Sequence, residues 1–118
     1  AMASGSTSMD NIGELRHKET DRIAVMTKGL RLAGVNVDET NTGMCVHGTG
    51  DKNDFSHIRG GFRISSEHDH RIAMSFLILG LVSKNRIIVD GVSTIETSFP
   101  GFVETMNKHG AHINKEEI

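Results

Sequence analysis

Apolar residues recur at helical spacing in three stretches of the chain, which predicts three helices. The first covers about residues 21–33, with Thr20 as its N-cap. The second covers about residues 69–83 and is apolar almost all round, so it should be covered on several sides. The third begins at Pro100, a favoured first-turn residue, and ends at Gly110.

Short runs rich in β-branched or apolar residues lie between these helices, and glycines separate them. They predict strands at 35–38, 44–47, 62–64, 87–90 and near 111–113. Residues 48–53 are expected to form an exposed, mobile loop. The resulting order α-β-β-β-α-β-α-β is an α/β pattern. Because it opens on a helix with no strand before it, we expect a chain cut from a larger domain.

The composition excludes several classes of protein. Hydrophobic residues make up only 36% of the 118 residues, and Trp and Tyr are absent, which suggests that part of the core lies elsewhere. A net charge of -2, with Phe as the only aromatic residue, argues against a nucleic-acid partner. Cys45 is the only cysteine, which excludes an internal disulfide and suits a cytoplasmic protein.

No targeting or membrane-spanning segment is predicted. Residues 1–9 contain neither an apolar stretch nor a cationic start, so we expect a disordered cloning remnant there and place the fold in residues 10–118. The longest apolar run, 72–82, is interrupted by Ser75 and Gly80. It is far shorter than the roughly 20 residues that a membrane span needs, so we expect a soluble protein without a membrane partner.

An arginine occurs in the first turn of two predicted helices. The segments DRIAVM at 21–26 and DHRIAM at 69–74 are similar, and they contain Arg22 and Arg71. The helix dipole favours an acidic residue at this position and disfavours a basic one. Two arginines placed against that preference predict an anion bound near the helix N-termini.

The segment LRHKETDR at 15–22 is the most highly charged, because six of its eight side chains are ionisable. Such a run can be a solvated loop. The alternative is a site for a multiply charged anion, held by Arg16, Lys18 and Arg22. Glu19 would then lie close to these cations and transfer a proton when the reaction needs one.

His68, Asp69 and His70 superficially resemble metal ligands at the start of the second predicted helix. A metal site needs a further ligand at a recognisable spacing, and the sequence offers none. We therefore predict no metal site.

Three blocks together resemble one family. LRHKETDR at 15–22, DHRIAM at 69–74 and TSFP at 97–100 have the order and spacing of the C-terminal part of EPSP synthases, and the similarity covers residues 12–113. The resemblance implies an α/β fold of βαβαββ-type units, with a mixed sheet packed against helices, as part of the C-terminal domain of the enolpyruvyl transferase fold. It also implies transfer of the enolpyruvyl group of phosphoenolpyruvate to the 5-hydroxyl of shikimate 3-phosphate, with release of phosphate.

The resemblance assigns catalytic roles to two residues. Glu19 matches the family's proton donor to the methylene carbon of phosphoenolpyruvate, and Lys18 matches a lysine near the attacking hydroxyl. Arg16 is interpreted as structural. No cofactor is expected, and the partners would be the two substrates and the rest of the parent chain.

The resemblance assigns substrate binding to the second block as well. Arg22 and Arg71 match arginines that bind phosphoenolpyruvate, through its carboxylate. Asp69 and His70 match residues that orient Arg71 and line the pocket.

Two positions depart from the family pattern, and several family residues lie outside the chain. Thr97, preceded by Glu96, stands where the family often has a lysine that contacts phosphoenolpyruvate, and Glu14 stands where some members have an asparagine. The family's aspartate base and the residues that hold both phosphates lie upstream. We therefore expect the chain to be inactive alone.

Three alternatives remain open at this point. One is a related enolpyruvyl transferase that acts on a nucleotide sugar, although the KETDR block at 18–22 is not expected there. The second is a non-catalytic anion-binding or regulatory module. The third, a metal-dependent phosphohydrolase, would require a bound metal.

Overall fold

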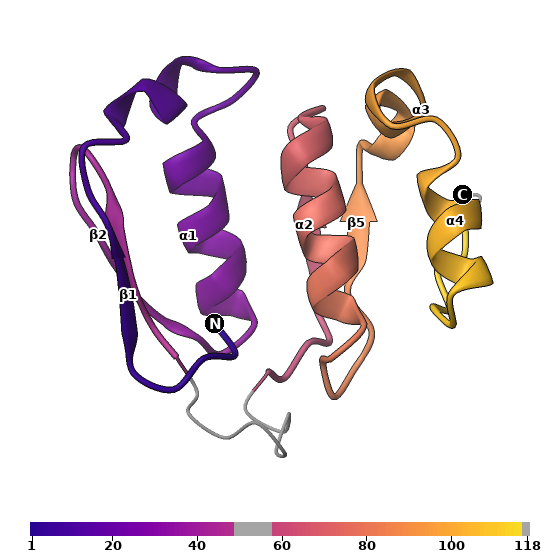
Figure 1. Cartoon of the computed structure of the whole chain (residues 1–118), viewed down its shortest axis with the longest axis horizontal. Helices are drawn as coiled ribbons and strands as arrows, with labels where there is room; N and C mark the ends of the chain where they lie inside the picture. Colours follow the sequence, from indigo (N-terminus) through magenta and orange to yellow (C-terminus); the bar gives the residue numbers. More distant parts are fainter. Residues whose placement is uncertain (49–57, 117–118) are drawn as a thin grey trace.

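The computed structural model describes residues 1–48 and 58–116, and it consists of two small sheets with two long helices between them (Figure 1). Helices α1 (Arg22–Leu32) and α2 (His70–Gly80) lie side by side. One sheet is antiparallel with the order β1-β3-β2, and the other is a parallel pair, β4-β5. The strands are β1 (Ser6–Met9), β2 (Asn36–Glu39), β3 (Met44–His47), β4 (Arg63–Ser65) and β5 (Ile88–Asp90).

Four short helices complete the described part of the chain: η1 (Gly13–His17), η2 (Val92–Thr94), α3 (Ile95–Ser98) and α4 (Phe102–Lys108). The predicted α/β fold, with strands packed against helices, is confirmed. The loop predicted for residues 48–53 falls, apart from Gly48, outside the described residues.

Strand β1 corrects the prediction that residues 1–9 are disordered, because Ser6–Met9 form a strand. It pairs antiparallel with β3, from Ser6 opposite His47 to Met9 opposite Met44. The Ser6 Oγ atom also lies 2.7 Å from Nδ1 of His47. Without β1, this edge of β3 would leave its backbone groups unpaired, so the ladder orders a segment whose own sequence has little strand character. A strand therefore does precede α1.

The predicted helices are present, but their boundaries differ. The N-cap of α1 is Asp21 rather than Thr20, because the Asp21 carboxylate accepts a hydrogen bond from the Ala24 N–H at 3.0 Å. A carboxylate at the positive end of the helix dipole is favoured by charge as well as by hydrogen bonding. Helix α2 ends at Gly80, three residues before its predicted end, and α4 begins at Phe102.

The strand predicted near residues 111–113 does not form. The Asn107 side-chain amide forms hydrogen bonds with both backbone groups of Ile113. It accepts from the Ile113 N–H at 2.8 Å and donates to the Ile113 carbonyl oxygen at 2.9 Å. These bonds fasten the segment to the end of α4 instead of to a neighbouring strand.

Helix α2 contributes to two apolar clusters, as its nearly continuous apolar sequence predicted. Ile72 and Phe76 pack with Ile64 of β4, while Ala73 packs with residues of α3 and α4. A third cluster lies between α1 and the three-stranded sheet: Leu30, Ala33, Val35, Val37, Met44, Val46 and Ile58. Met26 of α1 and Leu79 of α2 pack against both this cluster and the one around Ile64, so the two long helices share their apolar contacts.

Gly29 allows α1 to approach α2 closely. A Cβ atom at this position would lie 2.0 Å from Cζ of Phe76 and 2.6 Å from Cδ1 of Ile64, and Phe76 is only 1% exposed. We expect Gly29→Ala to lower the free energy of unfolding by about 1–2 kcal/mol, because overpacking outweighs the gain of about 1 kcal/mol in helix propensity. Urea unfolding would measure the change.

The matched control for this prediction is Gly80→Ala, also within a helix. Its Cβ would meet Ile87 Cβ at 3.7 Å, an ordinary contact. This variant should be neutral or slightly stabilising. If both variants changed the free energy of unfolding equally, close packing at Gly29 would not be the cause.

Candidate active site

The N-terminal ends of α1 and α2 lie at the same end of the molecule, the upper edge in Figure 1, and an ion pair joins them. Arg22 Nε donates to Asp69 Oδ2 at 2.7 Å, and Nη2 lies 3.4 Å from Oδ1. The side chain of Asp69 is fully buried and that of Arg22 is 13% exposed. This largely buried pair connects the two helix ends through residues 47 positions apart in the sequence.

The turn between β4 and α2 places Asp69 in the interior. Glu67 and His68 both have left-handed backbone conformations, with φ of 53° and 59°. Ser66, which is fully buried, donates from Oγ to the Gly91 carbonyl at 2.8 Å. Left-handed conformations of residues other than glycine cost about 1–3 kcal/mol each and cluster at functional sites. The strained turn therefore holds Asp69 in one defined position.

Asp69 remains ionised despite its burial. Burial raises the pKa of its carboxyl group, but the hydrogen bond from Arg22 and the Arg71 N–H at 2.9 Å outweigh this and hold the pKa below its ordinary value. The bond to Asp69 likewise raises the pKa of Arg22. Both groups are charged at neutral pH, so this pair serves as a fixed support rather than as a proton donor.

Asp69 supports a different arginine side chain from the one that the sequence suggested. The prediction was that Asp69 orients Arg71, but Asp69 contacts only the backbone N–H of Arg71, as the N-cap of α2. Its side-chain partner is Arg22, 47 residues earlier in the chain. The similarity of the two arginine segments pointed to this region, but not to the pairing of Arg22 with Asp69.

Glu19 lies on the other side of Arg22. Arg22 Nη2 donates to Glu19 Oε2 at 2.6 Å, and the Glu19 side chain is 51% exposed. Arg22 thus connects a buried carboxylate to an exposed one. An exposed carboxyl group beside a fixed cation can reach a bound ligand and exchange protons with it.

Two further cations flank this arrangement in sequence. Lys18 and Arg71 are exposed, and their side chains form no hydrogen bond or ion pair with the described residues. His70, the first residue of α2, is half-buried. Free cations at two joined helix N-termini are available to an anionic ligand.

Arg16 does not belong to this set of free cations. All three of its nitrogens donate to groups within the protein: Asp21, Glu39 and the carbonyl oxygens of Thr40 and Asn41. The hypothesis that Arg16 helps to hold an anion is therefore wrong, and its interpretation as structural is confirmed. Two of its partners are backbone carbonyls about 25 residues away, which leave no signature in a sequence.

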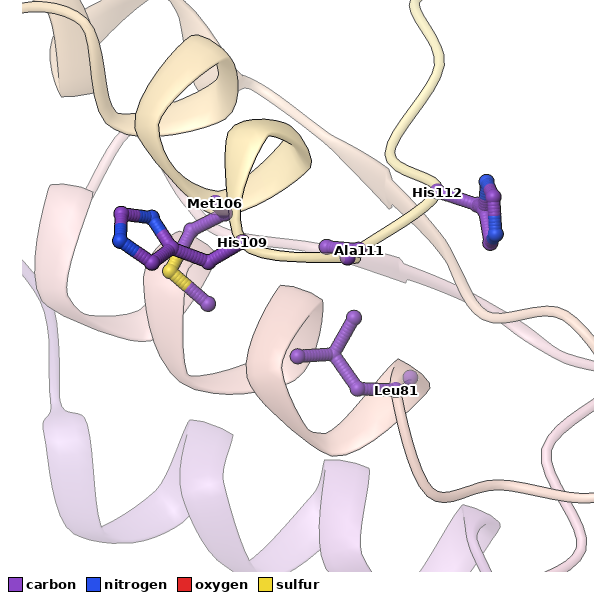
Figure 2. A pocket seen from close by; sticks show the side chains of 7 residues that line it. Leu81, Met106, His109, Ala111 and His112 are labelled. Atoms are coloured by element: carbon purple, nitrogen blue, oxygen red, sulfur yellow. The ribbon is translucent and has the colours of Figure 1, made fainter.

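A hollow of about 340 Å³ lies elsewhere, at the C-terminal end of α2 (Figure 2). It is lined by Gly80, Leu81, Met106, His109, Gly110, Ala111 and His112. The rings of His109 and His112 point away from each other, so they do not form a joint site (Figure 2). The charged cluster around Arg22 lies outside this hollow.

The described residues, 1–48 and 58–116, also bear on metal binding and membrane insertion. Within these ranges, no three His, Cys, Asp or Glu side chains are arranged to hold a metal ion. The described helices all fall short of the length and apolar character that a bilayer-spanning segment needs.

Comparison with known proteins gives one consistent family. The family model of EPSP synthase (3-phosphoshikimate 1-carboxyvinyltransferase) matches residues 1–106. A 3-phosphoshikimate 1-carboxyvinyltransferase of Phenylobacterium zucineum is 50% identical over 113 residues, which is 96% of this chain and 24% of the relative. One from Paramagnetospirillum magneticum is 47% identical over 114 residues, or 97% of this chain and 24% of the relative.

The fold is similar to that of a solved structure with the same family name. An EPSP synthase from Acinetobacter baumannii superposes with a TM-score of 0.92 at 42% identity, over 99% of this chain and 26% of that one. The chain therefore spans about a quarter of the length of these relatives.

Proposed function

Because this chain belongs to the EPSP synthase family, we propose that it forms part of a 3-phosphoshikimate 1-carboxyvinyltransferase. That enzyme moves the enolpyruvyl group of phosphoenolpyruvate to the 5-hydroxyl of shikimate 3-phosphate and releases phosphate. The observation that carries the proposal is the position of Arg22, which is joined to buried Asp69 on one side and to exposed Glu19 on the other. Such a cation is fixed in place and still borders an accessible carboxyl group.

Substrate binding is assigned to the two arginines at the helix ends. Arg22 uses Nε and Nη2 for Asp69 and Glu19, and its Nη1 donates to none of the described residues. Nη1 and the free guanidinium of Arg71 are therefore left to bind the carboxylate of phosphoenolpyruvate. His70 would line the same pocket.

Glu19 and Lys18 are assigned to the chemical step. Glu19 gives a proton to the methylene carbon of phosphoenolpyruvate while the 5-hydroxyl oxygen attacks the neighbouring carbon, which forms a tetrahedral intermediate. Glu19 then takes a proton back from the new methyl group as the C–O bond to phosphate breaks. Lys18 lies near the attacking hydroxyl and stabilises the negative charge that develops on its oxygen.

Other groups of the active site would come from the rest of the parent chain. A base for the 5-hydroxyl and cations for both phosphates are needed, and each such contact stabilises the transition state by about 2–4 kcal/mol. We therefore expect the 118-residue chain alone to release no measurable phosphate from the two substrates. Turnover by this chain at the rate of the full-length protein would contradict that division of the site.

The test of the function is phosphate release by the full-length parent. It is given phosphoenolpyruvate with shikimate 3-phosphate, phosphoenolpyruvate alone, or phosphoenolpyruvate with a nucleotide sugar. Release that requires shikimate 3-phosphate supports the proposal. Release with the nucleotide sugar would instead identify a related transferase, and binding of phosphoenolpyruvate without any release would identify a non-catalytic anion-binding module.

A further inference from the structure

Arg16 closes the base of the short arch that carries Lys18 and Glu19. The arch consists of residues 18–20, between the end of η1 at His17 and Asp21, the N-cap of α1. Arg16 belongs to η1, and its Nη1 reaches across to the Asp21 carboxylate, at 2.9 Å from Oδ2 and 3.2 Å from Oδ1. Asp21 is also the N-cap of α1. One guanidinium therefore connects the two ends of the arch.

The same guanidinium also fastens the arch to the turn between β2 and β3. Arg16 Nη2 donates to Glu39 Oε2 at 2.9 Å, and Nε donates to the Asn41 carbonyl at 2.9 Å. The Thr40 carbonyl accepts a further bond from Nη2. The Ile12 N–H donates to the Thr42 carbonyl at 2.8 Å, so the start of η1 rests on the same turn.

The charges in this contact are fixed. Burial raises the pKa of the Asp21 carboxyl group, but hydrogen bonds from the Ala24 N–H and from Arg16 outweigh this and hold the pKa below its ordinary value. A planar fork with several N–H groups can serve a carboxylate and carbonyls at the same time, whereas a lysine ammonium cannot match that geometry. The arrangement therefore depends on arginine and not on positive charge alone.

We propose that Arg16 is a positioning residue that sets where Lys18 and Glu19 stand relative to the substrates, an inference that rests on the proposed function. Glu19 must reach a carbon atom for proton transfer, and a misplacement of about 1 Å in an active site can reduce the rate by 10²-fold. Lys18 and Glu19 are exposed, and Glu19 is held on one side by Arg22, while Arg16 binds Asp21 at the end of the segment that carries them.

The experiment uses the full-length parent with Arg16→Gln, Arg16→Lys, Asp21→Asn and a control, Arg31→Gln. Asparagine still caps a helix, so Asp21→Asn removes the charge that faces Arg16 without removing the cap. Arg31 also donates to a carbonyl of the same sheet, that of Val37, from Nε at 3.2 Å and from Nη2 at 2.8 Å. Both of these Arg31 bonds end at Val37, outside the arch.

Three experiments are made on each variant: steady-state kinetics for kcat and both KM values, thermal unfolding for the midpoint, and deuterium uptake by the methylene group of phosphoenolpyruvate in D2O with shikimate 3-phosphate present. Deuterium uptake reports proton transfer at the carbon that Glu19 serves. We expect Arg16→Gln to lower kcat and deuterium uptake by about 10- to 100-fold while KM for shikimate 3-phosphate changes less than threefold. Arg16→Lys should recover only part of this loss.

The outcomes separate the two proposals. The positioning role would be overturned if Arg16→Gln and Arg31→Gln lost equal fractions of kcat and of deuterium uptake, or if folded Arg16→Gln enzyme took up deuterium at the wild-type rate. Either result would leave the proposed function standing. If Arg16→Gln does not fold, Asp21→Asn decides, because reduced uptake supports the role and normal uptake overturns it. A wild-type parent that neither releases phosphate nor takes up deuterium would overturn the proposed function, and the role of Arg16 with it.

Discussion

Replacing Glu19 by glutamine in the full-length parent should reduce kcat for phosphate release by about 10²–10⁴-fold, the usual contribution of a general acid–base group. The amide has nearly the size of the carboxyl group, and its oxygen can still accept the bond from Arg22, 2.6 Å away in the native chain. It cannot deliver a proton to carbon or take one back. The fold and substrate binding should therefore survive while the chemical step fails.

The matched control is Glu104→Gln, an exposed carboxylate on α4. It should retain wild-type kcat, because a surface charge far from the joined helix ends contributes little. Steady-state phosphate release and isothermal titration with shikimate 3-phosphate give kcat and substrate affinity separately. A Glu19→Gln enzyme with kcat within threefold of wild type would remove Glu19 from the mechanism, even if the two-substrate requirement held.

The sequence predicted most of what depends on local pattern. The nearly continuous apolar character of α2 indicated a helix covered on several sides, and Ile72 and Ala73 do face different clusters. The paired arginine segments pointed to two helix starts that do lie together, joined by the Arg22–Asp69 ion pair, while the anion predicted there stays a prediction. Amphipathic period and helix-end chemistry act within a few residues, which makes them visible in a sequence.

What the sequence did not predict depends on partners distant in the chain. The segment Ser6–Met9 has no apolar alternation, and its strand exists because the edge of β3 offers unpaired backbone groups. Arg16 binds the carbonyls of Thr40 and Asn41, groups that every residue possesses. Asp69 could have served the nearby Arg71 side chain, and only the packing of α1 beside α2 decides that it serves Arg22.

Asp69→Asn should cost about 3–5 kcal/mol of unfolding free energy, because it leaves the largely buried guanidinium of Arg22 without its counter-charge. Asparagine can still cap α2 by accepting from the Arg71 N–H, so the loss reports the charge pair rather than the cap. The matched control is Asp90→Asn. Asp90 pairs with Arg63 at 2.8 Å, but both side chains are about half exposed, so this loss should stay within about 1 kcal/mol.

The dependence on pH gives this prediction a second check. The pKa of Asp69 is held below its ordinary value in the folded chain, so the carboxylate stabilises the fold above the unfolded value of about 3.9. That contribution is lost as the pH falls through the lower, folded pKa, where protonated Asp69 becomes neutral like asparagine. Urea unfolding at several pH values should therefore give free energies of unfolding for wild type and Asp69→Asn that become equal in acid. Two results would mean that the Arg22–Asp69 pair does not hold the two helix ends together. One is a loss of unfolding free energy at pH 7 that is no larger for Asp69→Asn than for Asp90→Asn. The other is a difference between wild type and Asp69→Asn that persists after Asp69 is protonated.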